Sequence, residues 1–204
     1  YFQCHRGTYT AQAEIKRSNR LCENGVRALE ILSTIANKSE NTPYPQEEIL
    51  SIWKIILLNQ FHDILPGSSI YEVNRRALEM YGDALNKIDS GINNTIAPLC
   101  DRGDGAVLIN TLSVAVNRVV ELDSRFVDGA ATLDGKAIPH TVSGDKTLAL
   151  VNIPPMGITS IIPKKQDNTY TPVSIKETPE GYEISNECVV ASISKEGLLL
   201  SFKD

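Results

Sequence analysis

The sequence predicts an α+β protein in which an antiparallel three-helix bundle precedes part of an all-β sandwich. Over the first 100 residues, apolar side chains recur at three- and four-residue steps, the spacing of one helix face. After residue 100, short runs rich in β-branched residues are separated by Gly, Pro, Asn and Asp, as in strands joined by turns. We therefore expect a helical domain over residues 10–100 and a β region over residues 101–204.

The composition narrows the class of protein. The chain has 204 residues, of which 42% are hydrophobic, with 20 basic and 25 acidic side chains and a net charge of −5. This mildly acidic balance argues against a dedicated nucleic-acid binder, which usually carries a basic excess. No apolar run approaches the roughly 18 residues of a membrane span, and no signal peptide is visible. We expect neither nucleic acid nor membrane as a partner, and we expect a piece of a longer protein.

The four cysteines are widely spaced and form no CxxC pair, so neither a zinc ribbon nor a redox motif is indicated. Free cysteines are among the most buried residues. We therefore expect reduced and mostly buried thiols, which suit a reducing compartment. They are Cys4, Cys22, Cys100 and Cys188.

The first helix is expected from Thr10 to Ala36, with Lys16 among the residues of its polar face. Its apolar positions follow the helical period and should form one stripe. They are Ile15, Leu21, Cys22, Gly25, Leu29, Leu32 and Ile35.

The second helix, from about Gln46 to Phe61, has almost no polar face. A helix that is apolar all round is buried on several sides, so it should lie in the centre of something larger. Trp53 should be buried in its core. That core should also contain Ile52, Ile56, Leu32 and Met80.

The third helix is expected to start near Ser68 or Ser69 and to end near Ala97-Pro98. Ser69 is a good N-cap, and Glu72 three residues later completes a capping-box pattern. Three helices joined by short loops predict an antiparallel bundle.

Eight short segments of the second half have the composition of strands, and three Gly-containing turns separate some of them. Their number and spacing predict a sandwich. The strands are expected at Ala106–Asn110, Arg118–Leu122, Ala137–His140, Thr147–Val151, Thr159–Pro163, Tyr182–Ser185, Val189–Ile193 and Leu198–Phe202, and the turns at Asp134-Gly135, Ser143-Gly144 and Glu196-Gly197.

His62 and Asp63 form an adjacent pair at the end of the most apolar helix. Such a pair is costly to bury unless it is bonded to something, which makes it a candidate site. The alternative is a histidine packed at a helix C-terminus, where the helix dipole favours its protonated form. One His is not a metal site, because zinc takes four ligands. The residues alone leave both interpretations open.

The segment His5-Arg6-Gly7-Thr8-Tyr9-Thr10 gathers an imidazole, a cation, a phenol and two hydroxyls around one glycine. These groups can hydrogen-bond a polyhydroxylated ligand. The alternative is a solvated loop in which Thr10 caps the first helix.

Two segments resemble the α-mannosidases of glycoside hydrolase family 38. The first comprises Tyr1-Phe2 and the segment from His5 to Thr10. The second is long and highly specific: Leu57-Leu58-Asn59-Gln60-Phe61-His62-Asp63-Ile64-Leu65-Pro66-Gly67-Ser68-Ser69-Ile70. Two later segments resemble the start of the family's C-terminal β region more loosely. They are Leu108-Ile109-Asn110-Thr111-Leu112-Ser113 and Pro154-Pro155-Met156-Gly157.

The resemblance implies a metal-dependent retaining α-mannosidase that releases terminal mannose from oligosaccharides. Residues 1–9 would end an N-terminal catalytic barrel, residues 10–100 would form the helical middle domain, and residues 101–204 would start the C-terminal β-sandwich region. The partners of this piece would be the oligosaccharide, the barrel and the remaining β region of the same chain.

The resemblance also implies the site. Family members bind one divalent metal, usually zinc, through two His and two Asp. His62 matches one of these His ligands, and Asp63 matches the neighbouring Asp that binds sugar hydroxyls; His5, Arg6 and Tyr9 would line the mouth of the site. The other ligands and the aspartate nucleophile would lie in the barrel, so this piece alone should be inactive and should bind little or no zinc.

One departure within the family indicates the compartment. Golgi and lysosomal members carry a second His immediately before the metal-binding one, whereas Phe61 stands there in this chain. This pattern resembles the cytosolic, vacuolar and bacterial members. We expect a cytoplasmic protein, with the vacuole as the alternative.

Two alternative hypotheses assign the chain to other classes of function. One is a stand-alone helical interaction module with a β tail, in which His62 and Asp63 are structural. The other is a carbohydrate-binding β module, which needs a platform of exposed aromatic side chains. The candidates for that platform are Phe126, Tyr170, Tyr182 and Phe202.

Overall fold

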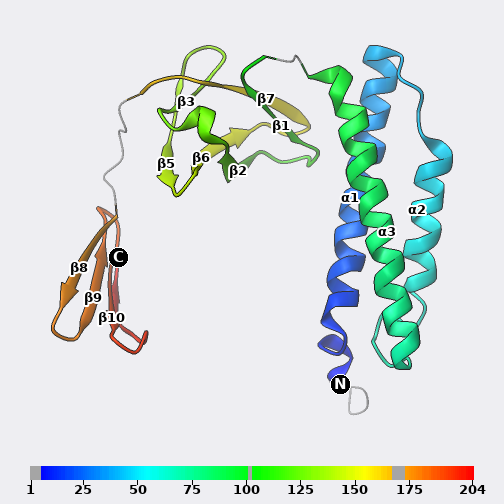
Figure 1. Cartoon of the computed structure of the whole chain (residues 1–204), viewed down its shortest axis with the longest axis horizontal. Helices are drawn as coiled ribbons and strands as arrows, with labels where there is room; N and C mark the ends of the chain where they lie inside the picture. Colours follow the sequence, from blue (N-terminus) through cyan, green and yellow to red (C-terminus); the bar gives the residue numbers. More distant parts are fainter. Residues whose placement is uncertain (1–5, 101–102, 167–172) are drawn as a thin grey trace. The chain divides into compact units, whose positions relative to one another are not determined.

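A computed structural model describes residues 6–100, 103–166 and 173–204. The chain divides into two compact units, which we describe separately. The first comprises residues 1–103 with the short pieces 109–114 and 155–157, and the second comprises the rest. Three helices followed by antiparallel sheets confirm the predicted α+β class (Figure 1). None of the described helices is long and apolar enough to cross a membrane.

The helical unit is an up-down-up bundle of α1 (Ala13–Glu40), α2 (Gln46–Asn59) and α3 (Tyr71–Ile96) (Figure 1). A 3₁₀ turn, η1 (Arg6–Tyr9), precedes α1, and another, η2 (Ala97–Leu99), follows α3. Helices α1 and α3 run in the same direction: Cys22 lies against the Tyr81 carbonyl, and Ser33 lies 3.5 Å from Thr95. Helix α2 runs the opposite way and contacts α1 through Trp53 and Gln60.

The bundle core is built from the predicted stripes. Its fully buried members come from all three helices, and Ile52 and Ile56 are among them as predicted. Trp53 is half-buried, because its indole N–H reaches out to donate to Glu30 Oε1 at 2.9 Å. Trp53 nevertheless packs against the core, and Leu32 is buried as expected, whereas the expectation for Met80 is wrong because it is half-buried and outside the core. The core residues are Ile15, Cys22, Val26, Leu29, Ile49, Ile52, Ile56, Ala77, Tyr81, Ala84 and Ile88.

Helix α2 is not buried on several sides in this chain. Ile52 and Ile56 face the core, whereas Leu50, Leu57 and Leu58 are between 43% and 62% exposed. The apolar positions of α2 therefore form two faces, and only one of them is covered within the described chain. On α1, Leu21 and Ile35 are likewise exposed, because their positions fall at the edges of the stripe.

The helix ends differ from the predicted caps. Thr10 does not cap α1: the N-cap is Gln12, which adopts a left-handed conformation (φ 49°) with no side-chain cap. Ser69 does not cap α3 either, because the N-cap is Ile70 and the Ser69 hydroxyl donates to the Asp63 carbonyl at 2.5 Å. Helix α1 continues to Glu40, four residues beyond the expected end, and α2 stops at Asn59.

The second half of the chain forms three antiparallel sheets. Their strand orders are β1-β7-β3-β4, β2-β6-β5 and β11-β10-β9-β8. The first two sheets contribute to one core together with Phe126 of the 3₁₀ turn η3 (Ser124–Phe126). The strands are β1 (Ala106–Asn110), β2 (Val116–Leu122), β3 (Ala130–Thr132), β4 (Ala137–Ile138), β5 (His140–Ser143), β6 (Lys146–Ile153), β7 (Gly157–Pro163), β8 (Ser174–Thr178), β9 (Gly181–Ser185), β10 (Val190–Ser194) and β11 (Leu199–Lys203).

All eight expected strand segments are strands, although the segment Ala137–His140 divides between β4 and β5. The three expected turns are confirmed by positive φ angles at their glycines, between 63° and 87°. Two strands were not predicted. Strand β3 has three residues, two of them alanines, and β8 alternates polar and charged residues around Ile175, so neither has the expected composition.

The thiols are less buried than expected. Cys22 is fully buried in the bundle, whereas Cys100 is half-buried and Cys188 is exposed. These three are free thiols, and Cys4 lies outside the described residues.

Candidate functional site

The predicted pair His62 and Asp63 lies in the turn between α2 and α3. After Asn59 the backbone turns at Phe61. The Phe61 carbonyl accepts hydrogen bonds from the amides of Ile64 at 2.9 Å and Leu65 at 3.1 Å. Gly67 then adopts φ 84°, which favours glycine, and its amide donates to Ile64. The segment Phe61–Gly67 is thus a hydrogen-bonded turn rather than an open loop.

Both side chains of the pair point into solvent. The His62 side chain is 77% exposed and that of Asp63 is 57% exposed, with His62 Nε2 3.5 Å from Asp63 Oδ2. The His62 ring lies beside the Phe61 ring, with centroids 4.2 Å apart. This exposure argues against the alternative of a histidine packed at the helix C-terminus, and the imidazole and carboxylate are both accessible from outside the described chain.

An open hollow of about 580 Å³ borders Asp63. Its lining residues are one acidic residue and two serines together with one aromatic and three aliphatic residues. Such a mixture suits a polyhydroxylated ligand, whose hydroxyls need hydrogen bonds and whose C–H face needs an apolar contact. The lining residues are Phe61, Asp63, Ile64, Ser68, Ser69, Ile70 and Val73.

The N-terminal site candidates lie on η1 and the residues that follow. Arg6 is exposed, and Tyr9 is 71% exposed; His5 lies outside the described residues. Their segment approaches the turn where Ala11 meets Gly67: a methyl group on Gly67 would stand 2.9 Å from the Ala11 carbonyl oxygen. The two motifs singled out in the sequence, about 50 residues apart, therefore adjoin in space.

The sequence analysis missed two residues that shape this turn. Ser69, expected to cap α3, instead binds the Asp63 carbonyl. Lys16, expected on a solvated helix face, donates to backbone carbonyls on both sides of the junction. No local sequence signal could have indicated the Lys16 contacts, because two of its three acceptors are 49 and 50 residues away.

The pair is a partial fit for the metal that the family resemblance implies. His62 offers an imidazole and Asp63 a carboxylate, both of which bind zinc. In residues 6–100, 103–166 and 173–204, however, no group of three or more His, Cys, Asp or Glu is placed to hold a metal ion. The described chain can thus contribute a ligand, but further ligands have to come from elsewhere.

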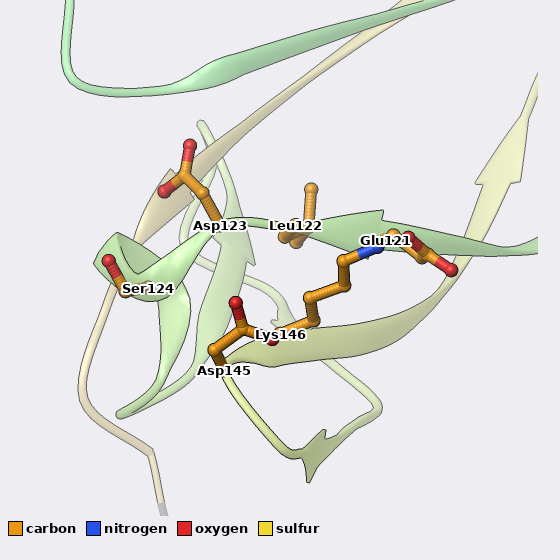
Figure 2. Close-up of a pocket in the computed structure, with 6 residues that line it drawn as sticks. All are labelled: Glu121, Leu122, Asp123, Ser124, Asp145 and Lys146. Atoms are coloured by element: carbon orange, nitrogen blue, oxygen red, sulfur yellow. Dashed lines mark hydrogen bonds and ion pairs between the residues drawn. The ribbon is translucent and has the colours of Figure 1, made fainter.

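A second hollow, of about 380 Å³, lies in the β unit beside β2 and β6 (Figure 2). Two of its carboxylates are bound to neighbours: Lys146 pairs with Glu121, and Arg125 donates to both carboxylate oxygens of Asp123. The hydrogen bonds from Arg125 hold the pKa of Asp123 below its usual value. A carboxylate kept ionised by its own partner is a poor general acid, so the turn after α2 is the stronger candidate.

Comparisons with known proteins agree on one family. The family described as "Alpha mannosidase middle domain" matches residues 3–99. "Alpha-mannosidase 2C1" of Homo sapiens is 29% identical over 98% of this chain and 18% of its own length. "Alpha-mannosidase" of Saccharomyces cerevisiae is 38% identical over 47% of this chain and 9% of its own length. This chain thus spans less than a fifth of these relatives.

A solved structure shows the same fold. The crystal structure of an alpha-mannosidase from Enterococcus faecalis V583 superposes with a TM-score of 0.69 and covers 97% of this chain and 28% of that one. The sequence identity is 17%, so this likeness concerns the fold alone.

Proposed function

The chain belongs to the α-mannosidases, with residues 3–99 as their middle domain, and on this premise we propose that it is part of a longer, retaining glycoside hydrolase. The longer protein releases terminal α-mannose from oligosaccharides. Support comes from the relatives, which carry the name α-mannosidase and are more than five times as long as the matched segment. The partners of this chain are then the mannose-containing substrate and the rest of the same protein, a catalytic barrel and further β domain.

One observation carries the proposal: His62 and Asp63 are exposed on a hydrogen-bonded turn rather than packed into the core, and Asp63 lines an open hollow. Exposed charged and polar side chains at an open hollow can bind a ligand or metal from outside the chain. We propose that His62 contributes one ligand to a divalent metal, zinc by family resemblance. When bound, that metal would hold neighbouring sugar hydroxyls and favour the charged transition state.

Asp63 has a different role in this proposal. Its carboxylate accepts hydrogen bonds from sugar hydroxyls, and the Ser69 hydroxyl fixes its backbone. In this proposal Arg6 and Tyr9 line the mouth of the site and offer a cation and a phenol to the substrate; the resemblance adds the imidazole of His5, which lies outside the described residues. A retaining glycosidase needs two carboxyl groups on opposite sides of the scissile bond. The resemblance puts the nucleophile in the barrel, so the 204-residue chain alone is inactive.

The compartment proposed is the cytoplasm. Phe61 before His62 is the pattern of the cytosolic, vacuolar and bacterial types, and Cys22, Cys100 and Cys188 are free thiols. The rival carbohydrate-binding β module loses support, because Phe126 is fully buried between sheets and is unable to contribute to an aromatic platform. Tyr182 and Phe202 remain exposed, and Tyr170 lies outside the described residues.

The experiment replaces the two side chains in the whole protein. His62→Ala should lower the metal content. It should also lower turnover of a chromogenic α-mannoside by at least about a hundredfold, since loss of a ligand lowers the metal affinity of the site. Asp63→Asn should keep the metal and lower turnover about ten- to a hundredfold, the equivalent of roughly 1.5–3 kcal/mol for one charged hydrogen bond.

Matched controls are available. His140 belongs to β5 and Asp89 to the exposed side of α3, and neither is part of the two segments that carry the candidate site, so His140→Ala and Asp89→Asn should leave turnover and metal unchanged. Full metal and normal turnover in His62→Ala would show that the ligand assignment is wrong. Loss of the metal in Asp63→Asn would show that Asp63 acts on the metal rather than on the sugar.

A further inference from the structure

The ammonium group of Lys16 joins the two segments that carry the candidate site. It donates to the Ala11 carbonyl at 2.5 Å, the Leu65 carbonyl at 3.0 Å and the Pro66 carbonyl at 3.2 Å. A lysine ammonium has three N–H groups, so its whole donor capacity is used on backbone carbonyls. One acceptor, Ala11, lies two residues after the end of η1, and the other two belong to the turn that carries His62 and Asp63.

The same junction is tight and conformationally demanding. Gln12 is left-handed with φ 49° on one side, and Gly67 has φ 84° on the other. A methyl group on Gly67 would stand 2.9 Å from both the Ala11 carbonyl oxygen and the Gln12 side chain. A non-glycine residue in the left-handed region persists only where its surroundings enforce it. The close packing and the three ammonium bonds supply that enforcement.

We propose that Lys16 is a positioning residue, whose ammonium group fixes the turn Phe61–Gly67 against the start of α1 and thereby orients His62 and Asp63. Its anchor is firm, because Lys16 lies one position after Ile15, which is fully buried in the bundle core. Burial of the ammonium lowers the pKa of Lys16 from its ordinary value. The importance of Lys16 for catalysis rests on the function proposed above, whereas its hold on the turn does not.

The test uses the whole protein with Lys16→Met, which keeps the length of the side chain and removes all three donors. Amide hydrogen exchange at Ile64, Leu65 and Gly67 reports the turn directly, because these amides close its hydrogen bonds. We expect their exchange to accelerate about tenfold or more, with kcat for an α-mannoside falling at least about tenfold. Exchange at the core positions Val26 and Leu29 should not change, since the bundle does not depend on this contact.

Three companion variants sharpen the result. Lys16→Arg keeps the charge but spreads its donors over a planar fork that is unable to converge on three carbonyls, so kcat should recover only in part. Gly67→Ala disturbs the junction from the other side without touching the ammonium and should accelerate the same amides. Lys38→Met, at an exposed lysine near the far end of α1, is the matched control and should behave like the unmodified protein.

The outcomes separate the two proposals. Unchanged exchange in both Lys16→Met and Gly67→Ala would show that the junction does not hold the turn. Accelerated exchange with normal kcat and KM, in a protein that His62→Ala inactivates, would leave the proposed function intact and overturn the positioning role. If His62→Ala were also fully active, the proposed function would fail, and the exchange data would still decide whether Lys16 holds the turn.

Discussion

The interior of the helical bundle and the turn at its end are built in opposite ways. In the interior, apolar side chains from three helices are fully buried, and a buried polar pair joins two of the helices: the Tyr81 hydroxyl donates to Asn19 Oδ1 at 3.0 Å. In the turn, backbone groups and the Lys16 ammonium make the bonds, while His62 and Asp63 remain exposed. The interior closes with residues of this chain, whereas the turn presents side chains that are open to a group outside it.

The largest effect should come from truncating the interior. Ile56 of α2 is fully buried in the bundle core. Ile56→Ala removes three methyl or methylene groups and leaves a cavity, so the free energy of unfolding of the 204-residue chain should fall by about 2–5 kcal/mol. Urea unfolding followed by circular dichroism measures this. A loss below about 1 kcal/mol would mean that the bundle interior is not the closed core described above.

An effect of intermediate size is expected in the pH dependence of the free energy of unfolding. Burial, helped by the Glu23 carboxylate, raises the pKa of the Cys22 thiol from 9.0 to about 11. Between these values the unfolded chain loses a proton that the folded chain keeps. The free energy of unfolding therefore falls as pH rises from 9 to 11, with a slope of at most about 1.4 kcal/mol per pH unit from this group. Burial also raises the pKa of Tyr81, which steepens the loss above pH 10.

The measurement is urea unfolding at pH 8, 9 and 10 with two matched variants. Cys22→Ala should give a shallower decline with pH than the unmodified chain. Cys188→Ala, at an exposed thiol, should leave the slope unchanged. Equal slopes in all three proteins would contradict a titrating thiol inside the bundle and would weaken the contrast between interior and turn.

The same contrast separates what the sequence can predict from what it cannot. Helical periodicity predicts Ile15, Cys22 and Leu29 as core residues, because a stripe is a local property of one helix. It failed for Leu57 and Leu58, since apolar character does not reveal which face a neighbour covers. It also failed for Ser69, whose hydroxyl found a carbonyl six residues away instead of the helix terminus.

The residues of the candidate site likewise divide into those that the sequence indicates and those that only the fold reveals. His62 and Asp63 are indicated by the sequence because they form a contiguous motif with a family resemblance, and the structure adds their exposure and the hollow beside Asp63. Lys16 was assigned to a solvated face, because its role depends on Leu65 and Pro66, which only the folded bundle brings near. The packing of Gly67 against Ala11 is equally non-local.

The smallest effect should come from the residue next to Ile56. Leu57 is 62% exposed, and it belongs to the uncovered apolar face of α2 with Leu50 and Leu58. In the 204-residue chain, Leu57→Ala should change the free energy of unfolding by no more than about 0.5 kcal/mol, because little contact is lost and alanine favours the helix. In the whole protein the same change should cost more, roughly 1–3 kcal/mol, if the rest of that protein covers this face. Urea unfolding of both proteins measures the difference. A cost that is equally small in both would show that the face stays open to solvent, and that the interior alone accounts for the apolar residues of α2.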